Sequence, residues 1–292
     1  MTSTPRYDVV AIGNAIVDVI ARADDQFITD RALDKGSMRL IDTAEAENLY
    51  AAMGPGIERS GGSAANTLAG MAALGRKCSF IGMVADDQLG RVFRHDLTAL
   101  GVDFDSPVGP AEPPTARCLI LVTPDGQRTM NTFLGASQNL GREALDAAVI
   151  ADSAVLYLEG YLWNADASRA AMAEAIGMAR AAGRKVAFTL SDSFVVALHG
   201  DDFRRMSDAG EIDILFANEA EITALYDARL FRMWQFYLAG AEQSFRSGGM
   251  VNFHIQSVKR RSAVPMNRDY IGAEAARLSA LDEAPKWHLA RE

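Results

Sequence analysis

Two carboxylates of the sequence lie where a parallel α/β sheet would place ligand-binding groups. Asp18 follows the apolar run that ends at Gly13, and Asp192 follows the apolar run 186–190. Ligands of such sheets bind beyond the carboxyl ends of the strands, and a carboxylate there can accept hydrogen bonds from ligand hydroxyls. The alternative for Asp18 is a turn or helix-start carboxylate without a ligand.

A pair of glycines, Gly61 and Gly62, precedes a segment of helical periodicity that spans 63–74. Glycine lets the backbone approach a ligand closely and adopt conformations that other residues avoid. Asn66, one turn into this helix, offers both a hydrogen-bond donor and an acceptor. The segment has neither the GxxxxGKS/T nor the GxGxxG pattern of phosphate-binding loops. The pair therefore marks either a ligand-binding loop or a plain turn.

The histidines and cysteines indicate no metal site. The 4 histidines are scattered, and the two cysteines, Cys78 and Cys118, show no metal or disulfide spacing. We expect two buried thiols in a reducing compartment, and hence a cytoplasmic protein. The charge of −9 disfavours nucleic acid as a partner, and no apolar run approaches the roughly 18 residues of a membrane span.

Strand-like and helix-like stretches alternate along most of the chain. Short apolar runs predict strands, and periodic segments between them predict helices; the expected strands are 7–13, 78–84, 154–158, 186–190 and 212–217. An Ala-rich helix is expected over 165–182, and the segment 116–133 alternates around a Thr-Pro-Asp-Gly turn, as a β-hairpin does. This order predicts a parallel sheet with helices on both faces.

The same segments resemble the PfkB (ribokinase-like) family of sugar and nucleoside kinases, and within it the adenosine-kinase-like branch. The resemblance extends almost unbroken over 7–226. The stretches that carry it are GNAIVDV (13–19), SGGSAANTLAGMAALG (60–75), FIGMVADDQLG (80–90), GVDF (101–104), PPTARCLILVTPDGQRTMNTFLGAS (113–137), LEGYLW (158–163), LSDSF (190–194) and ILFANEAEITALY (214–226).

The resemblance implies a central sheet with a small β lid, formed by 36–41 and the 116–133 hairpin. It also implies an ATP- and Mg²⁺-dependent kinase that phosphorylates a hydroxyl of a nucleoside or sugar. The substrate side would use Asp18, Gly61, Gly62 and Asn66, with Arg117 and Asn131 as lid contacts. The nucleotide and Mg²⁺ side would use Asn218 and Glu221 of an Asn-x-x-Glu motif, together with Asp192.

One family motif is missing from the 292 residues. Members of the family carry a Gly-Ala-Gly-Asp segment whose amides form an anion hole and whose Asp takes the hydroxyl proton. No such segment follows Glu221, and the mimic around Gly240 lacks the second glycine. We therefore assign no catalytic residue and no metal ligand set, expect ATP binding to be impaired, and predict that phosphoryl transfer is lost or severely weakened.

The composition changes near residue 227. Residues 1–226 carry a net charge of −12, whereas 227–292 carry +3 and 8 of the 23 aromatic residues. Residues 226–270 resemble the C-terminus of cyclopropane-fatty-acyl-phospholipid synthases. We therefore expect an incomplete kinase domain over 1–226, followed by a mainly helical segment of different origin, although a basic helix pair on one domain would give the same charge pattern.

These observations leave three hypotheses open. The chain is a kinase of reduced activity, a non-catalytic module that binds a nucleoside or sugar, or an unstable fusion product. A sheet that lacks its last strands would expose an edge, so a homodimer through the lid or through that edge is a further expectation.

Overall fold

A six-stranded sheet lies at the centre of the computed structural model, which describes residues 5–226. Its strand order is β13-β12-β11-β1-β5-β7, and every neighbouring pair is parallel. The strands are β1 (Tyr7–Ile12), β5 (Cys78–Ile81), β7 (Val102–Asp103), β11 (Ser153–Glu159), β12 (Lys185–Thr189) and β13 (Ile214–Phe216). The predicted parallel α/β sheet is confirmed.

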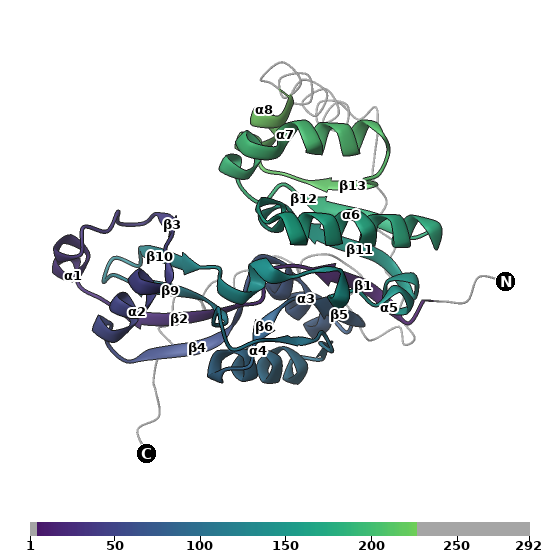
Figure 1. The fold of residues 1–292 in the computed structure, drawn as a ribbon. Coiled ribbons are helices and arrows are strands. Elements are labelled where there is room, and N and C mark those ends of the chain that lie inside the picture. Colours follow the sequence, from purple (N-terminus) through teal and green to yellow (C-terminus); the bar gives the residue numbers. More distant parts are fainter. Residues whose placement is uncertain (1–4, 227–292) are drawn as a thin grey trace, which may run out of the picture. The chain divides into compact units, whose positions relative to one another are not determined.

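Helices cover both faces of this sheet (Figure 1). The helices are α3 (Ser63–Ala73), α4 (Gln88–Ala99), α5 (Ala147–Ala151), α6 (Asp166–Ala181), α7 (Ser193–Asp208) and α8 (Glu219–Tyr226), with short 3-10 turns η1 (Gly135–Asn139), η2 (Arg142–Ala144) and η3 (Gly160–Asn164). Helices α6 and α7 share one apolar core with β12, in which Phe188 and Phe203 pack with ring centroids 5.0 Å apart. Helices α3 and α4 share the other core, on the opposite face.

A second, five-stranded sheet has the order β3-β10-β9-β2-β4 and mixes parallel and antiparallel pairs. Its strands are β2 (Ile16–Arg22), β3 (Met38–Leu40), β4 (Gly56–Gly61), β9 (Ala116–Val122) and β10 (Arg128–Phe133). The helices α1 (Asp25–Asp30) and α2 (Thr43–Ala52) lie between β2 and β4 in the sequence. This is the predicted β lid, and the hairpin β9–β10 forms around Gly126, whose φ of 81° suits the turn. The sequence pattern did not indicate β2 and β4.

One predicted strand is divided in the structure. The run 78–84 is not one strand: β5 ends at Ile81, and β6 (Val84–Ala85) pairs with β8 (Val108–Gly109) in a separate two-stranded sheet. Gly82 lies at this change of direction, where a Cβ atom would come within 2.5 Å of Phe80 and 3.0 Å of the Gly13 carbonyl oxygen. A residue with a side chain would therefore clash at position 82.

β13 is the last strand at its end of the six-stranded sheet within residues 5–226. Ile214 and Phe216 on this strand are 42% and 52% exposed. The predicted homodimer contact at this edge stays a prediction.

The boundary at 226/227 and the resemblance of 226–270 to cyclopropane-fatty-acyl-phospholipid synthases fall outside the described residues. None of the helices within them has the length and apolar character needed to cross a membrane.

Candidate active site

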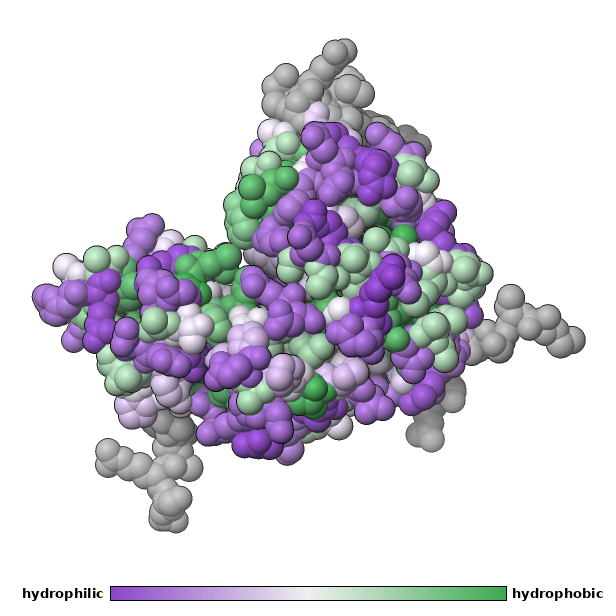
Figure 2. Space-filling model, viewed as in Figure 1, coloured by the Kyte–Doolittle hydropathy of each residue, from purple (hydrophilic) through white to green (hydrophobic). Residues whose placement is uncertain are grey.

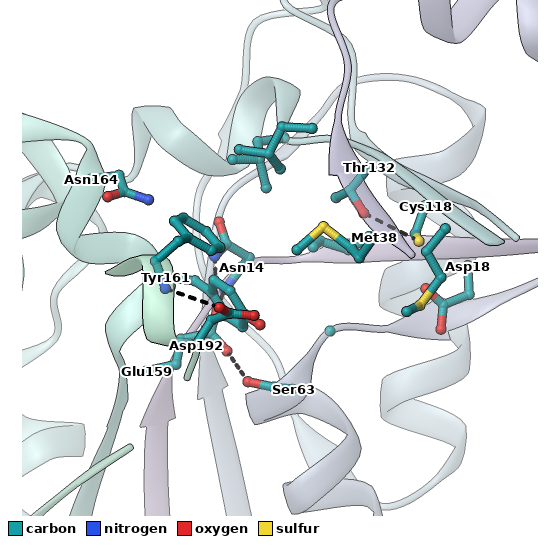
Figure 3. Close-up of a pocket in the computed structure, with 16 residues that line it drawn as sticks. Asn14, Asp18, Met38, Ser63, Cys118, Thr132, Glu159, Tyr161, Asn164 and Asp192 are labelled. Carbon is teal, nitrogen blue, oxygen red and sulfur yellow. Dashed lines mark hydrogen bonds between the residues drawn. The ribbon is translucent and has the colours of Figure 1, made fainter. Parts of the chain in front are cut away.

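A cavity of about 290 Å³ opens between the carboxyl ends of β1 and β11 and one face of the lid sheet. Figure 3 shows the residues that line it, with Asp18, Met38 and Cys118 from the lid at one end and Tyr161, Asn164 and Asp192 at the other. The surface view shows a notch with hydrophobic side chains on both sides of it (Figure 2). The volume of the cavity lies near the lower end of the range for small-molecule sites.

Asp18 follows β1 in the chain and lies within β2, so the alternative that it is a turn or helix-start carboxylate is wrong. Alternation along β2 buries Val17 and Val19 in the core and turns Asp18 towards the cavity. Its carboxylate lies over Gly61, where a Cβ atom would come within 2.4 Å of the Asp18 Cγ. No group in residues 5–226 donates a hydrogen bond to this carboxylate, and burial raises its pKa to about 6. Among these residues Asp18 is thus an acceptor without a donor, and it faces the cavity.

The glycine pair joins β4 to α3 at the cavity. Gly62 has a φ of 89° and precedes the first residue of the helix, and a Cβ atom there would approach the Asn14 carbonyl oxygen to 2.5 Å. Because of both constraints, a residue with a side chain could replace Gly62 only with strain. Gly62 and Ser63 line the cavity, whereas Asn66 is exposed one turn further along α3 and does not line it.

Glu159, the last residue of β11, connects three elements at the floor of the cavity. Its Oε1 accepts hydrogen bonds from the Asn14 backbone N–H and from Asn14 Nδ2, at 2.6 and 2.8 Å. Its Oε2 accepts from Ser63 Oγ and from the Ala64 N–H, at 2.7 and 3.0 Å. Burial raises the pKa of the Glu159 carboxyl, and these four hydrogen bonds oppose the rise. The carboxylate caps α3, for which Gly62 has no side chain to offer.

The opposite wall of the cavity comes from η3 and from the start of α7. The aromatic rings of Tyr161 and Phe194 lie with centroids 6.2 Å apart, and both residues line the cavity together with Asn164. Asp192 precedes α7 and accepts a hydrogen bond from the Phe194 N–H through Oδ1 at 3.1 Å. Within the described residues its Oδ2 has no donor, so one carboxylate oxygen of Asp192 is available to a ligand.

The sides of the cavity are apolar. Met38, Leu40, Met130 and Leu134 line it, and Leu40 is 47% exposed. Flexible methionines adapt to the shape of a flat ring, and an apolar wall with few polar groups is usual in small-molecule sites. Cys118 also lines the cavity, and burial raises the pKa of its thiol to about 11, so it contributes a neutral S–H group.

Arg117 and Asn131 lie away from the cavity. Because strand residues alternate between faces and Cys118 faces the cavity, its neighbour Arg117 points to the other side of the lid sheet. There the guanidinium carbon lies 5.8 Å from the ring centroid of Tyr50 and 5.8 Å from that of Phe133. Asn131 is fully buried and accepts a hydrogen bond from Arg39 Nε at 2.8 Å. Neither residue contacts the space that a substrate would occupy in this structure.

Asn218 and Glu221 form a reciprocal cap at the start of α8. The Asn218 N–H and Nδ2 donate to the two carboxylate oxygens of Glu221 at 3.1 and 2.8 Å, and the Glu221 N–H donates to Asn218 Oδ1 at 2.8 Å. This is the arrangement of a capping box. Between residues 5 and 226 no three His, Cys, Asp or Glu side chains cluster as metal ligands. The described residues therefore contain no Mg²⁺ site built from three or more protein ligands, and a Mg²⁺ ion here would depend on nucleotide phosphates.

The sequence analysis missed most of the residues that line the cavity, among them three with polar side chains that the site depends on. Asn14, Glu159 and Asn164 line the cavity, and the first two share the hydrogen bonds at its floor. Glu159 directly follows the predicted strand 154–158, so the rule that singled out Asp192 would also have found it. Asn164 had no comparable signal, because a 3-10 turn separates it from the strand.

A family model of pfkB family carbohydrate kinases matches residues 8–233. The chain belongs to this family. Adenosine kinase from Sinorhizobium meliloti is 50% identical with a TM-score of 0.71, over 76% of this chain and 68% of that one. A probable sugar kinase from Rhizobium etli is 46% identical with a TM-score of 0.73, over 81% and 72%. Guanosine-inosine kinase from Escherichia coli is 28% identical over 74% of this chain and 52% of its own length. The chain thus spans about half the length of such curated relatives.

The central hydrogen-bond network of this pfkB fold can be tested by Glu159→Gln. The amide would place an N–H₂ donor against the donors of Ser63 and Ala64 or of Asn14, so about 2–4 kcal/mol of unfolding free energy should be lost. Urea unfolding followed by circular dichroism measures the change. Glu47→Gln, on the exposed face of α2, is the matched control and should change stability by less than about 0.5 kcal/mol. Equal stability of the two variants would contradict the capping role.

The unpaired carboxylate of Asp18 should reduce stability at neutral pH. Because the folded pKa of about 6 exceeds the ordinary value of 3.8, the folded state holds this proton more tightly than the unfolded state. The cost is therefore absent below about pH 4, grows as the pH rises towards 6 and is complete above it. Asp18→Asn should raise unfolding free energy at pH 7 by about 1–3 kcal/mol and leave it unchanged near pH 4. A destabilised variant at pH 7 would show that Asp18 has a structural partner.

Proposed function

We propose that this chain binds a nucleoside, or the sugar part of one, in the cavity between the two sheets. The observation that carries the proposal is the Asp18 carboxylate, which faces the cavity without a donor in the described residues although burial disfavours its charge. A buried acceptor without a partner reduces stability, and it is retained where a ligand supplies the donors. Vicinal hydroxyls of a ribose are suitable donors, because two O–H groups can approach the two carboxylate oxygens.

The apolar walls support a nucleoside over a free sugar. A free sugar carries hydroxyls on most of its carbons and would leave several of them against Met38, Leu40 and Phe194, which line the cavity. A base ring would instead bury apolar surface against these side chains and against Tyr161. The likeness to an adenosine kinase at 50% identity favours adenosine as the first ligand to test.

By family, the reaction would be transfer of a phosphoryl group from ATP to a hydroxyl of the bound ligand. In this step the hydroxyl oxygen forms a bond to the γ-phosphorus, the bond to the bridging oxygen breaks, ADP leaves and a base takes the proton. We propose that this chain performs the step at a negligible rate, because its 292 residues contain no Gly-Ala-Gly-Asp segment. Loss of a general base alone typically costs about 10²- to 10⁴-fold. ATP and Mg²⁺ binding remain proposals, with Asp192 as a residue available to the donor side.

Isothermal titration calorimetry of the full chain with adenosine and with ribose tests the binding proposal. We expect a dissociation constant for adenosine on the order of micromolar, and Asp18→Asn should weaken it by about 10- to 100-fold, the worth of hydrogen bonds to a charged group. Asp105→Asn is the matched control, since Asp105 is exposed and does not line the cavity. Absence of adenosine and ribose binding, or equal binding by Asp18→Asn, would overturn the proposal.

An ADP-release assay with ATP, Mg²⁺ and adenosine separates the activity hypotheses. Binding without ADP release is the expected result and supports a binding module. ADP release that matches adenosine phosphorylation would show an active kinase, and would contradict the proposed loss of activity while leaving the binding proposal intact. A broad thermal transition that adenosine does not shift would favour the unstable fusion product.

A further inference from the structure

The side-chain amide of Asn164 is held by a residue that does not line the cavity. Asn164 is the last residue of η3 and lines the cavity, and its Oδ1 lies 2.8 Å from Nε2 of His199 on α7. Figure 3 shows the Asn164 nitrogen on the side of the amide that faces the cavity and the oxygen on the far side. His199 is seven residues beyond Asp192, so the helix that begins at the cavity also supplies this contact.

The backbone of η3 is fixed by a separate contact. Trp163, which is 2% exposed, donates from Nε1 to Asp202 Oδ2 at 3.0 Å. Its ring packs edge-on against Phe188 and Phe203, with centroids 5.9 and 5.7 Å away. Because this anchor positions η3 on α7 without His199, the His199 hydrogen bond is left to determine which end of the Asn164 amide faces the cavity.

The protonation of His199 decides this orientation. Burial lowers the pKa of His199, the charge of Arg169 on α6 acts in the same direction, and Asp202 on α7 opposes them. A neutral imidazole has one donor nitrogen and one acceptor nitrogen. When Nε2 carries the proton, it donates to Asn164 Oδ1 and the amide N–H₂ faces the cavity. When Nδ1 carries it instead, Nε2 accepts from the amide and the carbonyl oxygen faces the cavity.

We propose that His199 is a positioning residue that keeps the donor end of Asn164 towards the ligand. The inference rests on the proposed nucleoside site and adds a specificity to it. Asp18 and Asn164 lie at opposite ends of the cavity (Figure 3), so a ligand whose hydroxyls bind Asp18 presents its other end to Asn164. That end must carry a hydrogen-bond acceptor, either a ring nitrogen or a carbonyl oxygen. The rings of Tyr161 and Phe194 beside Asn164 suit a flat heteroaromatic group.

Calorimetry on variants of the full chain tests the donor. His199→Phe keeps a ring against Phe203, whose centroid lies 6.3 Å from that of His199, and removes the donor. We expect it to weaken adenosine binding by about 5- to 10-fold, the worth of one ordinary hydrogen bond, with ribose binding unchanged. His199→Gln restores a donor nitrogen and should bind adenosine within about twofold of the natural chain. In an Asn164→Ala background, His199→Phe should have no further effect.

A ligand-free measurement distinguishes failure of this inference from failure of the proposed function. Long-range ¹H–¹⁵N correlation spectra of histidine-labelled full chain report which nitrogen of each of its 4 histidines carries the proton. A proton on Nε2 of His199 is expected, and a proton on Nδ1 alone would overturn the inference. Equal losses of adenosine and ribose affinity in both His199 variants would also overturn it, because they would indicate a structural role. If the natural chain binds neither compound, the proposed function fails, and the spectra still decide how His199 holds Asn164.

Discussion

The cavity depends on one buried carboxylate that accepts four hydrogen bonds. Glu159 joins the carboxyl ends of β1 and β11 to the first turn of α3, through Asn14 on one side and Ser63 and Ala64 on the other. These elements are far apart in the sequence, and packing of β1 against β11 alone would not fix the start of α3. A charge buried in this way is tolerated because donors surround it. Once α3 is fixed, Gly62 and the end of β4 are fixed too, and with them the position of Asp18.

Asp18 and Glu159 show two uses of a buried carboxylate in one site. Glu159 has its donors within the protein, so it stabilises the fold, whereas Asp18 has none among the described residues and is costly at neutral pH. The strand that bears Asp18 is held in place by packing, because Val17 and Val19, on either side of Asp18, are buried in the core. A binding group held on a packed strand needs little reorganisation when the ligand arrives.

The sequence alone was enough to predict the parallel sheet, the β9–β10 hairpin and α3, because each has a clear periodicity and a glycine at its boundary. It failed at β2, because only Gly13, Asn14 and Ala15 separate the end of β1 at Ile12 from the start of β2 at Ile16, and Asp18 lies within this second strand. The resemblance implied that Arg117 and Asn131 are lid contacts. Their positions along β9 and β10 instead place both residues on the face of the lid sheet that points away from the cavity. Asn164 depends on a contact with α7 that no local pattern encodes.

Residues 5–226 contain the cavity proposed for ligand recognition, whereas the sequence contains no Gly-Ala-Gly-Asp segment for phosphoryl transfer. The proposed recognition requires that an ionised Asp18 accepts hydrogen bonds from the ligand. The affinity of the full chain for adenosine between pH 5 and pH 8 tests this claim most directly. The dissociation constant should be constant above pH 6 and should rise by up to about tenfold per pH unit below it, as the carboxylate takes up its proton. An affinity that is the same at pH 5 and pH 8 would contradict the claim.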